Sequence, residues 1–162
     1  MNKKTLVIIV AVILVVVLAI CGIKALGKGN SNDNNIEGTL EDIMEKLYSG
    51  IPEDELPHLG NIEVSQDNIE YYLGTSDISY SEALASEPLM SSIAHSVVLV
   101  RLNDSKDAET VKEKISNNIN PAKWICVEVE KQNVKVASKG NLVVLIMDNE
   151  IADKILENFN NL

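Results

Sequence analysis

The chain has few of the residues that build disulfides, metal centres and aromatic binding platforms. Its 162 residues include two Cys, two His, one Trp and one Phe. Cys21 lies inside a long apolar run, which leaves Cys126 alone in the rest of the sequence, so no disulfide can close there. The zinc motifs H-E-x-x-H and C-x-x-C do not occur. We therefore expect no disulfide framework, no zinc centre and no resident cofactor.

Positive charge is scarce between residues 29 and 91. Residues 29–91 contain fourteen Asp or Glu and one Lys, a net charge of −13, whereas residues 92–162 contain ten acidic and nine basic residues. An acidic half repels nucleic acid and anionic lipid headgroups. No G-x-x-x-x-G-K-[ST] phosphate loop and no D-x-[DN]-x-[DN]-G calcium loop occurs. The sequence excludes nucleic acid as a partner and predicts an acidic face that could meet a protein or a cell-wall component.

Residues 5–23 form a long apolar run. Fourteen of these nineteen residues are Val, Ile or Leu, and none is charged. As a helix the run would be about 28 Å long, close to the roughly 30 Å hydrocarbon core of a bilayer. In lipid every backbone group must be satisfied within the segment, so a transmembrane helix is predicted despite the β-branched residues. The chain then divides into a cytoplasmic flank (1–4), the helix (5–23), a flexible tether (24–38) and a folded domain (39–162).

Two other fates of this N-terminal segment are open. Residues 25–27 (Ala-Leu-Gly) resemble a cleavage site, although the apolar run is longer than the roughly 7–15 residues of a cleaved signal. Residues 18–21 (Leu-Ala-Ile-Cys) resemble a lipobox, except that Ile20 stands where a small residue is needed. Three positive charges precede the run, counting the amino terminus, and two lysines follow it. This bias favours a single-pass cell-membrane protein with an extracytoplasmic domain.

The pattern of residues 39–162 predicts one α+β domain, in which a small, mainly antiparallel sheet of about four strands packs with about three helices. Residues 95–102 and 142–147 are apolar on both faces, which is typical of central strands covered on each side. Residues 124–130 and 133–137 alternate apolar and charged side chains and are expected at the sheet edges. The other expected elements are main helices at 39–49, 105–118 and from 149, a short helix at 81–86, a short element at 68–73, a turn at 138–141 and a loop at 50–66.

The order of features in the second half resembles a known family. Its features are a Pro-Leu-Met step at 88–90, a strand at 96–102, Asp104, a helix through 111–115, Trp124 after a Pro-containing bend, and a Lys-Gly-Asn-Leu turn at 139–142 before a last strand and helix. This order resembles the domain of unknown function 4358, which occurs in cell-envelope proteins of Gram-positive Firmicutes. Many members are lipoproteins or carry one N-terminal membrane segment. Over about residues 39–160, the resemblance implies the fold and an envelope location, and it implies no activity.

One group of residues could support hydrolysis. Ser91 and Ser92 precede His95 by four and three residues. Glu82 or Glu87 could orient the imidazole. However, the G-x-S-x-G nucleophile turn is missing, and His95 opens a strand pattern. We therefore favour a non-catalytic binding or accessory module. The alternative is a cell-envelope hydrolase that uses His95 with Ser91, Ser92 or a nearby carboxylate.

Aromatic residues offer one candidate contact surface. Tyr71 and Tyr72 are neighbours, and adjacent side chains cannot both face inward from one regular element. Packing of both through an irregular turn is the more common arrangement. Otherwise one of them is exposed beside Glu70 and forms part of a contact surface, so Glu70, Tyr71 and Tyr72 are the candidate binding residues. Trp124 is expected in the core, and Cys126 is expected to be a covered small hydrophobe.

Overall fold

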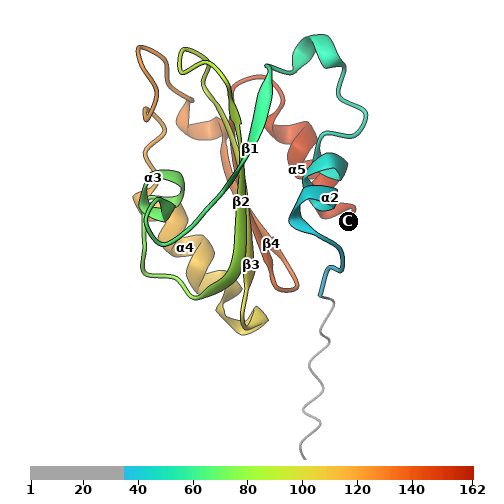
Figure 1. The fold of residues 1–162 in the computed structure, drawn as a ribbon, viewed down its shortest axis with the longest axis vertical. Coiled ribbons are helices and arrows are strands. Elements are labelled where there is room, and N and C mark those ends of the chain that lie inside the picture. The colour runs from blue at the N-terminus through green and yellow to red at the C-terminus, as the bar shows by residue number, and fades with distance from the viewer. Residues whose placement is uncertain (1–34) are drawn as a thin grey trace, which may run out of the picture. The chain divides into compact units, whose positions relative to one another are not determined.

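The computed structural model describes residues 35–162 (Figure 1). The transmembrane helix expected at 5–23 and most of the expected tether at 24–38 lie outside these residues. Between residues 35 and 162, no helix combines the length and the apolar character needed to cross a membrane. This part of the chain is α+β, as expected, with four α-helices packed on one five-stranded sheet.

All five strands pair antiparallel, in the order β1-β2-β3-β5-β4. Their bounds are β1 Leu59–Glu63, β2 Tyr80–Pro88, β3 His95–Leu102, β4 Val134–Lys139 and β5 Leu142–Asp148. β3 and β5 pair with each other inside the sheet and are buried on both faces, which confirms their expected central position. β4 is an edge strand, also as expected, and β1 forms the other edge.

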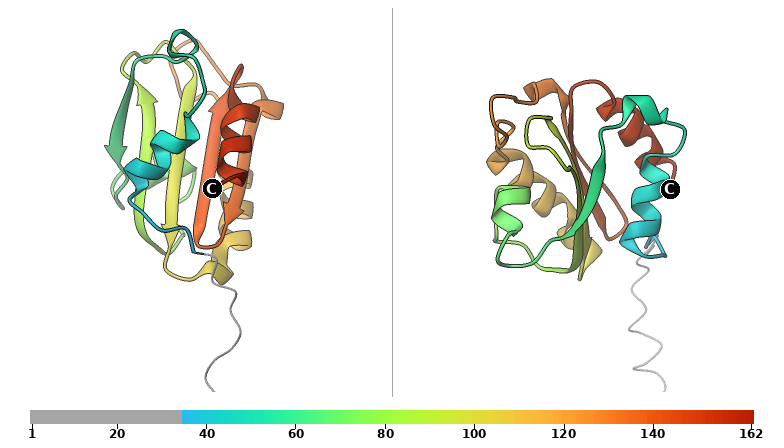
Figure 2. Two further views of the ribbon diagram at one scale, coloured as in Figure 1. Left: turned by 90° about the vertical axis from the view of Figure 1, so that its right-hand side faces the viewer. Right: turned by 45° about the horizontal axis from the view of Figure 1, so that its top comes forward.

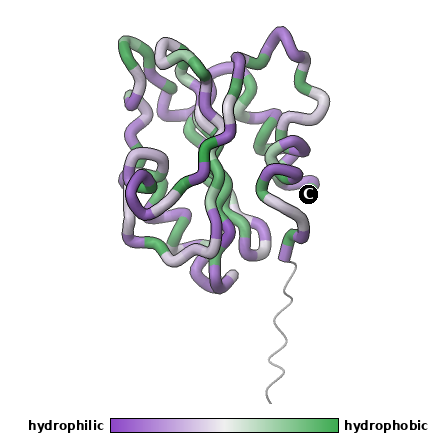
Figure 3. Tube along the Cα trace, viewed as in Figure 1, coloured by the Kyte–Doolittle hydropathy of each residue, from purple (hydrophilic) through white to green (hydrophobic). Residues whose placement is uncertain are grey.

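Helices cover both faces of the sheet (Figures 1 and 2). Their bounds are α2 Leu40–Leu47, α3 Ile69–Leu73, α4 Ala108–Asn118 and α5 Ala152–Asn160. α3 and α4 pack on one face, and α2 and α5 pack on the other. Successive strand residues point to opposite faces, so Val98 belongs to the α3–α4 core and its neighbour Leu99 to the α2–α5 core. Hydrophobic residues therefore follow the central strands (Figure 3).

Local signals set several boundaries as predicted. Thr39 caps α2, because its Oγ1 accepts a hydrogen bond from the backbone N–H of Asp42 at 3.1 Å. α3 ends at Gly74, whose φ of +72° is the left-handed conformation that glycine adopts without strain. Gly140, at φ +59°, occupies the turn between β4 and β5. These three positions confirm the expected start of the first helix, the end of the 68–73 element and the 138–141 turn.

Two strands lie where the sequence predicted other structures. The short helix expected at 81–86 is wrong, because these residues belong to β2. Their helix-forming composition is overridden by pairing with β1 on one side and β3 on the other, which buries residues 83–87. The loop expected at 50–66 is also wrong in part, since it contains β1. As a short, largely exposed edge strand, β1 lacks the apolar alternation that would reveal it.

The strand expected at 124–130 is wrong. This stretch is irregular, and Cys126 has a φ of +63°, which ends the alternation of side chains between two faces. The backbone N–H of Val129 donates to the carbonyl of Pro121 at 2.9 Å, so the chain folds back on itself. Trp124 is buried as predicted, whereas Cys126 is exposed rather than covered. The left-handed conformation at Cys126 breaks the strand pattern on which its expected burial rested.

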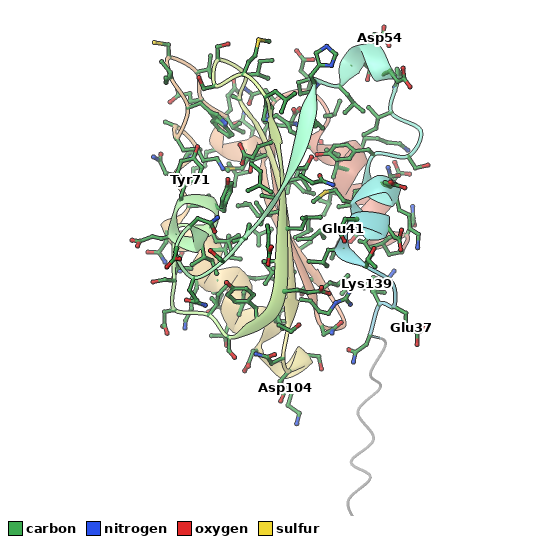
Figure 4. The ribbon with its side chains drawn as sticks, viewed as in Figure 1. Glu37, Glu41, Asp54, Tyr71, Asp104 and Lys139 are labelled. Carbon is green, nitrogen blue, oxygen red and sulfur yellow. The ribbon has the colours of Figure 1, made fainter. Side chains whose placement is uncertain are left out.

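The chain enters the folded domain at one end of β3. Arg101, near the end of β3, donates to the carbonyl oxygens of Ile36 and Gly38 at 2.6 and 2.7 Å, so ordered contacts begin before residue 39. His95 begins the same strand, six residues and about 20 Å away at roughly 3.3 Å per residue. Figure 4 shows Glu37 and Asp104 at the entry end and Asp54 at the opposite one. We call the opposite end, where residues 89–94 join β2 to β3, the distal end.

Candidate functional site

Two polar clusters lie at the distal end, on opposite faces of the sheet. They are centred on the neighbouring residues His95 and Ser96, which begin β3 and are fully buried. Because strand neighbours point to opposite faces, His95 faces the α2–α5 side and Ser96 the α3–α4 side. The sequence grouped His95 with Ser91 and Ser92, which lie in the loop before β3, and it did not single out Ser96.

His95 holds a buried hydrogen-bonded chain. Its Nδ1 lies 2.8 Å from Oδ2 of Asp148, and its Nε2 lies 2.8 Å from the hydroxyl of Tyr48. The other carboxylate oxygen of Asp148 accepts the backbone N–H groups of Glu150 and Ile151, both at 2.7 Å. Burial works to raise the pKa of Asp148, but the hydrogen bonds from His95 and these two N–H groups outweigh it, and the net pKa is lowered. Burial raises the pKa of Tyr48.

This arrangement leaves His95 without a free ring nitrogen that could activate a nucleophile. Both ring nitrogens are satisfied within the domain, and the side chain has no exposed surface. Ser91 and Ser92 are exposed in the 89–94 loop, and within residues 35–162 neither side chain forms a hydrogen bond with His95. The carboxylate that reaches His95 is Asp148, which the sequence did not single out. The two that it named act elsewhere, because Glu82 pairs with Arg101 at 2.5 Å and Glu87 belongs to the second cluster.

The second cluster is a buried ion pair with a hydroxyl. Nζ of Lys123 donates to Oε1 of Glu87 at 2.6 Å and to Oγ of Ser96 at 3.1 Å. Ser96 in turn donates to the same Glu87 oxygen at 2.5 Å. The Lys123 side chain is only 3% exposed. Burial lowers the pKa of Lys123, and the attraction of Glu87 only partly offsets this effect.

Three aromatic rings surround the ammonium of Lys123. Nζ lies 4.8, 5.0 and 5.2 Å from the ring centroids of Tyr71, Tyr72 and Trp124, which is within the range of cation–π attraction. Tyr71 and Tyr72 meet edge to face, with centroids 5.0 Å apart. Burial, followed by the negative charge of Glu87, raises the pKa of both tyrosines. We call these three rings with Glu87 and Ser96 the cation cage.

The candidate contact residues divide between surface and interior. Tyr72 is buried, whereas Tyr71 is 53% exposed and Glu70 is exposed beside it. α3 is a regular helix, so packing of both tyrosines through an irregular turn does not occur. Figure 4 shows Tyr71 on the outer side of the domain. The sequence did not reveal that Lys123, some fifty residues later, joins the two rings.

Large apolar side chains are exposed at the distal end. Leu89, Met90 and Ile125 are 73%, 55% and 67% exposed. The two segments that carry them are adjacent, because the backbone N–H of Ile125 donates to the carbonyl of Ser91 at 3.3 Å. Leu89 also covers β1, since a Cβ at Gly60 would lie 3.0 Å from it. We call Leu89, Met90 and Ile125 the apolar tip.

A cleft of about 510 Å³ opens at the same end. Its lining is part apolar, with Leu56, Ile93 and Val127, and part acidic, with Asp54, Glu55, Glu128 and Glu150. Within residues 35–162, none of these four carboxylates takes part in a salt bridge. In the same part of the chain, no group of three or more His, Cys, Asp or Glu side chains is placed to hold a metal ion.

Comparison with protein-family models, with curated proteins and with solved structures finds no match for this chain. The resemblance to the domain of unknown function 4358 therefore stays a prediction.

Proposed function

We propose that this chain is a membrane-anchored, non-catalytic binding module that contacts a partner protein through its distal end, on the outer side of the cell membrane. One observation carries the proposal: the apolar tip gathers three large exposed side chains at the end of the sheet remote from the chain's entry. Apolar side chains gathered on a surface are typical of protein contact sites. A few residues near the centre of such an interface usually supply most of its binding energy.

The cleft beside the tip extends the same surface. Of the four carboxylates that form no salt bridge within residues 35–162, two (Asp54 and Glu55) belong to the acidic stretch 29–91. The other two (Glu128 and Glu150) belong to later distal loops. Charges around an apolar contact steer association and discriminate between partners more than they add affinity. A partner with a basic rim around an apolar centre fits this surface best.

The non-catalytic part of the proposal is supported by the state of the reactive groups. His95, Ser96 and Lys123 are buried and bonded within the domain. A hydrolase that used His95 would have to open the contact with Tyr48 before a substrate could reach Nε2. The binding function needs no such opening.

The anchoring part of the proposal is supported by the composition of residues 5–23 and by the charge bias around them. An acidic domain is not held to anionic headgroups by its own surface, so an apolar anchor would keep it at the membrane. The resemblance to envelope proteins points to the same location.

The test uses the full-length chain in its own membranes. After carbonate extraction at high pH, an anchored chain stays in the pellet. Cross-linking in intact cells should then capture a partner with the wild-type chain and lose it with the triple variant L89S/M90S/I125S. The matched control is Ile62→Ser, which removes an exposed apolar side chain from β1, outside the tip. Capture of the same partner by the triple variant, or extraction of the intact chain into the soluble fraction, would contradict the proposal.

A further inference from the structure

The segment that carries Ile125 has neither helix nor strand to hold it. Residues 119–130 cross the distal end as an irregular chain between α4 and the short helical turn before β4. This segment supplies Ile125 to the apolar tip and Val127 and Glu128 to the cleft. Only scattered backbone hydrogen bonds hold it, such as those from Ile125 to Ser91 and from Val129 to Pro121, so side-chain contacts contribute much of its position. The proposed binding surface therefore depends on whatever fastens this segment.

Two polar side chains fasten the segment, in addition to the packing of Trp124 and Val129 in the core. Near its end, the amide of Asn149 donates to the carbonyl of Glu128 at 3.0 Å and accepts the backbone N–H of Glu130 at 2.9 Å. Near its start, Lys123 reaches into the cation cage and bonds to β2 through Glu87 and to β3 through Ser96. Ile125 lies between the two attachments, two residues beyond Lys123.

The ammonium of Lys123 specifies one position of the segment more strongly than an apolar side chain would. Apolar packing is non-directional and tolerates a shift of the chain. A buried ammonium needs both its hydrogen-bond acceptors and its counter-ion at fixed distances. A shift by one residue would bring Ala122 or Trp124 to the cage, and neither could pair with Glu87. Buried ion pairs contribute little net stability but can select one arrangement over others.

From this geometry we propose that Lys123 is the positioning residue of the distal surface: its ammonium, held in the cation cage, sets the register of residues 119–130 and thereby places Ile125 and Val127 for partner binding. This inference rests on the proposed function for its biological role. The positioning itself can be tested without any partner.

The single Trp of the chain provides the probe. Trp124 follows Lys123 directly and is buried in the wild type. In K123A, loosening of the segment should raise quenching of Trp124 fluorescence by acrylamide by roughly threefold, as expected when a local segment opens. Far-UV circular dichroism should remain that of the wild type, because the sheet and helices keep their own cores.

Chemical rescue separates positioning by charge from simple filling of space. Ala keeps only the Cβ of Lys123, so n-propylammonium replaces the missing atoms, and 1-propanol is a control of nearly equal size without charge. We expect n-propylammonium to return the quenching of K123A toward the wild-type value, while 1-propanol and sodium chloride leave it unchanged. K123R, which keeps a cation, should show a smaller rise than K123A. S96A removes one of the two acceptors and provides a milder variant if K123A does not fold.

The outcomes distinguish the two ideas. Wild-type quenching in K123A, or rescue by 1-propanol as complete as by n-propylammonium, overturns the positioning role of Lys123. If S96A is the variant used, wild-type quenching in it overturns the role as well. Partner capture by L89S/M90S/I125S overturns the proposed function and leaves the positioning result standing. If both ideas hold, K123A loses the captured partner and recovers it in n-propylammonium.

Discussion

Replacing Lys123 by Met should destabilise the domain far more than replacing Lys123 and Glu87 together. The K123M variant removes the ammonium and leaves the Glu87 carboxylate buried, with the hydroxyl of Ser96 as its one remaining side-chain donor among residues 35–162. Breaking a buried pair by removing one partner costs about 3–5 kcal/mol. Because Ser96 still donates to Glu87, we expect K123M to lower the free energy of unfolding by about 3 kcal/mol, the lower end of this range.

The double variant E87Q/K123M removes both charges while keeping the volume of both side chains. Burial lowers the pKa of Lys123 despite the attraction of Glu87, so removing the ammonium from water costs more than the ion pair returns. Neutral replacements avoid that cost, and Met packs well against aromatic rings. We expect E87Q/K123M to lie within about 1 kcal/mol of the wild type, since replacing both members of a buried pair is often neutral.

Urea unfolding of the folded domain, followed by far-UV circular dichroism, measures this difference. With a slope of about 2 kcal/mol per molar urea, K123M should unfold at a midpoint about 1.5 M lower than the wild type. The single variant E87Q completes the double-mutant cycle. The reasoning fails if K123M unfolds within about 0.3 M of the wild type, or if the double variant is as unstable as the two single changes added together.

Two further predictions concern backbone geometry and pH. Gly74 and Gly50 both have φ near +73°, but only at Gly74 would a Cβ meet other atoms, 2.3 Å from the carbonyl oxygen of Asn118. Gly50→Ala should therefore destabilise the domain by only about 1 kcal/mol, through left-handed backbone strain, and Gly74→Ala should lower the melting temperature much more than Gly50→Ala does. Equal decreases in the melting temperatures of the two variants would contradict this prediction. Burial raises the pKa of Tyr48, so the unfolded state loses that proton first and stability falls as pH rises above the ordinary tyrosine value of about 10. Tyr48→Phe should lower the free energy of unfolding by about 1 kcal/mol at neutral pH, because the hydrogen bond to His95 is lost. Between pH 10 and 11, urea titrations should show a smaller loss of stability for this variant than for the wild type. If stability falls equally steeply with pH in both proteins, Tyr48 is not the group responsible.

The elements that could be predicted from the sequence are those whose signal is local and strong. Residues 95–102 and 142–147 are continuous apolar runs, and such runs are stable only when both faces are covered, so β3 and β5 could be predicted as inner strands. Thr39 and Gly74 mark helix ends through the chemistry of their own side chains and backbone. The apolar run at 5–23 and the acidic stretch 29–91 could also be recognised without a structure, because each is a property of consecutive residues.

Tertiary structure decided the elements and contacts whose causes lie far away in the chain. β2 has a helix-forming composition and becomes a strand because β1 and β3 bind it on both edges. The distal clusters join His95 to Asp148 across 53 positions and Glu87 to Lys123 across 36. The alternation of strand side chains determined that His95 and Ser96 face different cores, but sheet register and the path of residues 119–130 selected their partners. Composition and periodicity describe what each segment can do alone, whereas a buried charge is stable only where distant segments bring its partner to it.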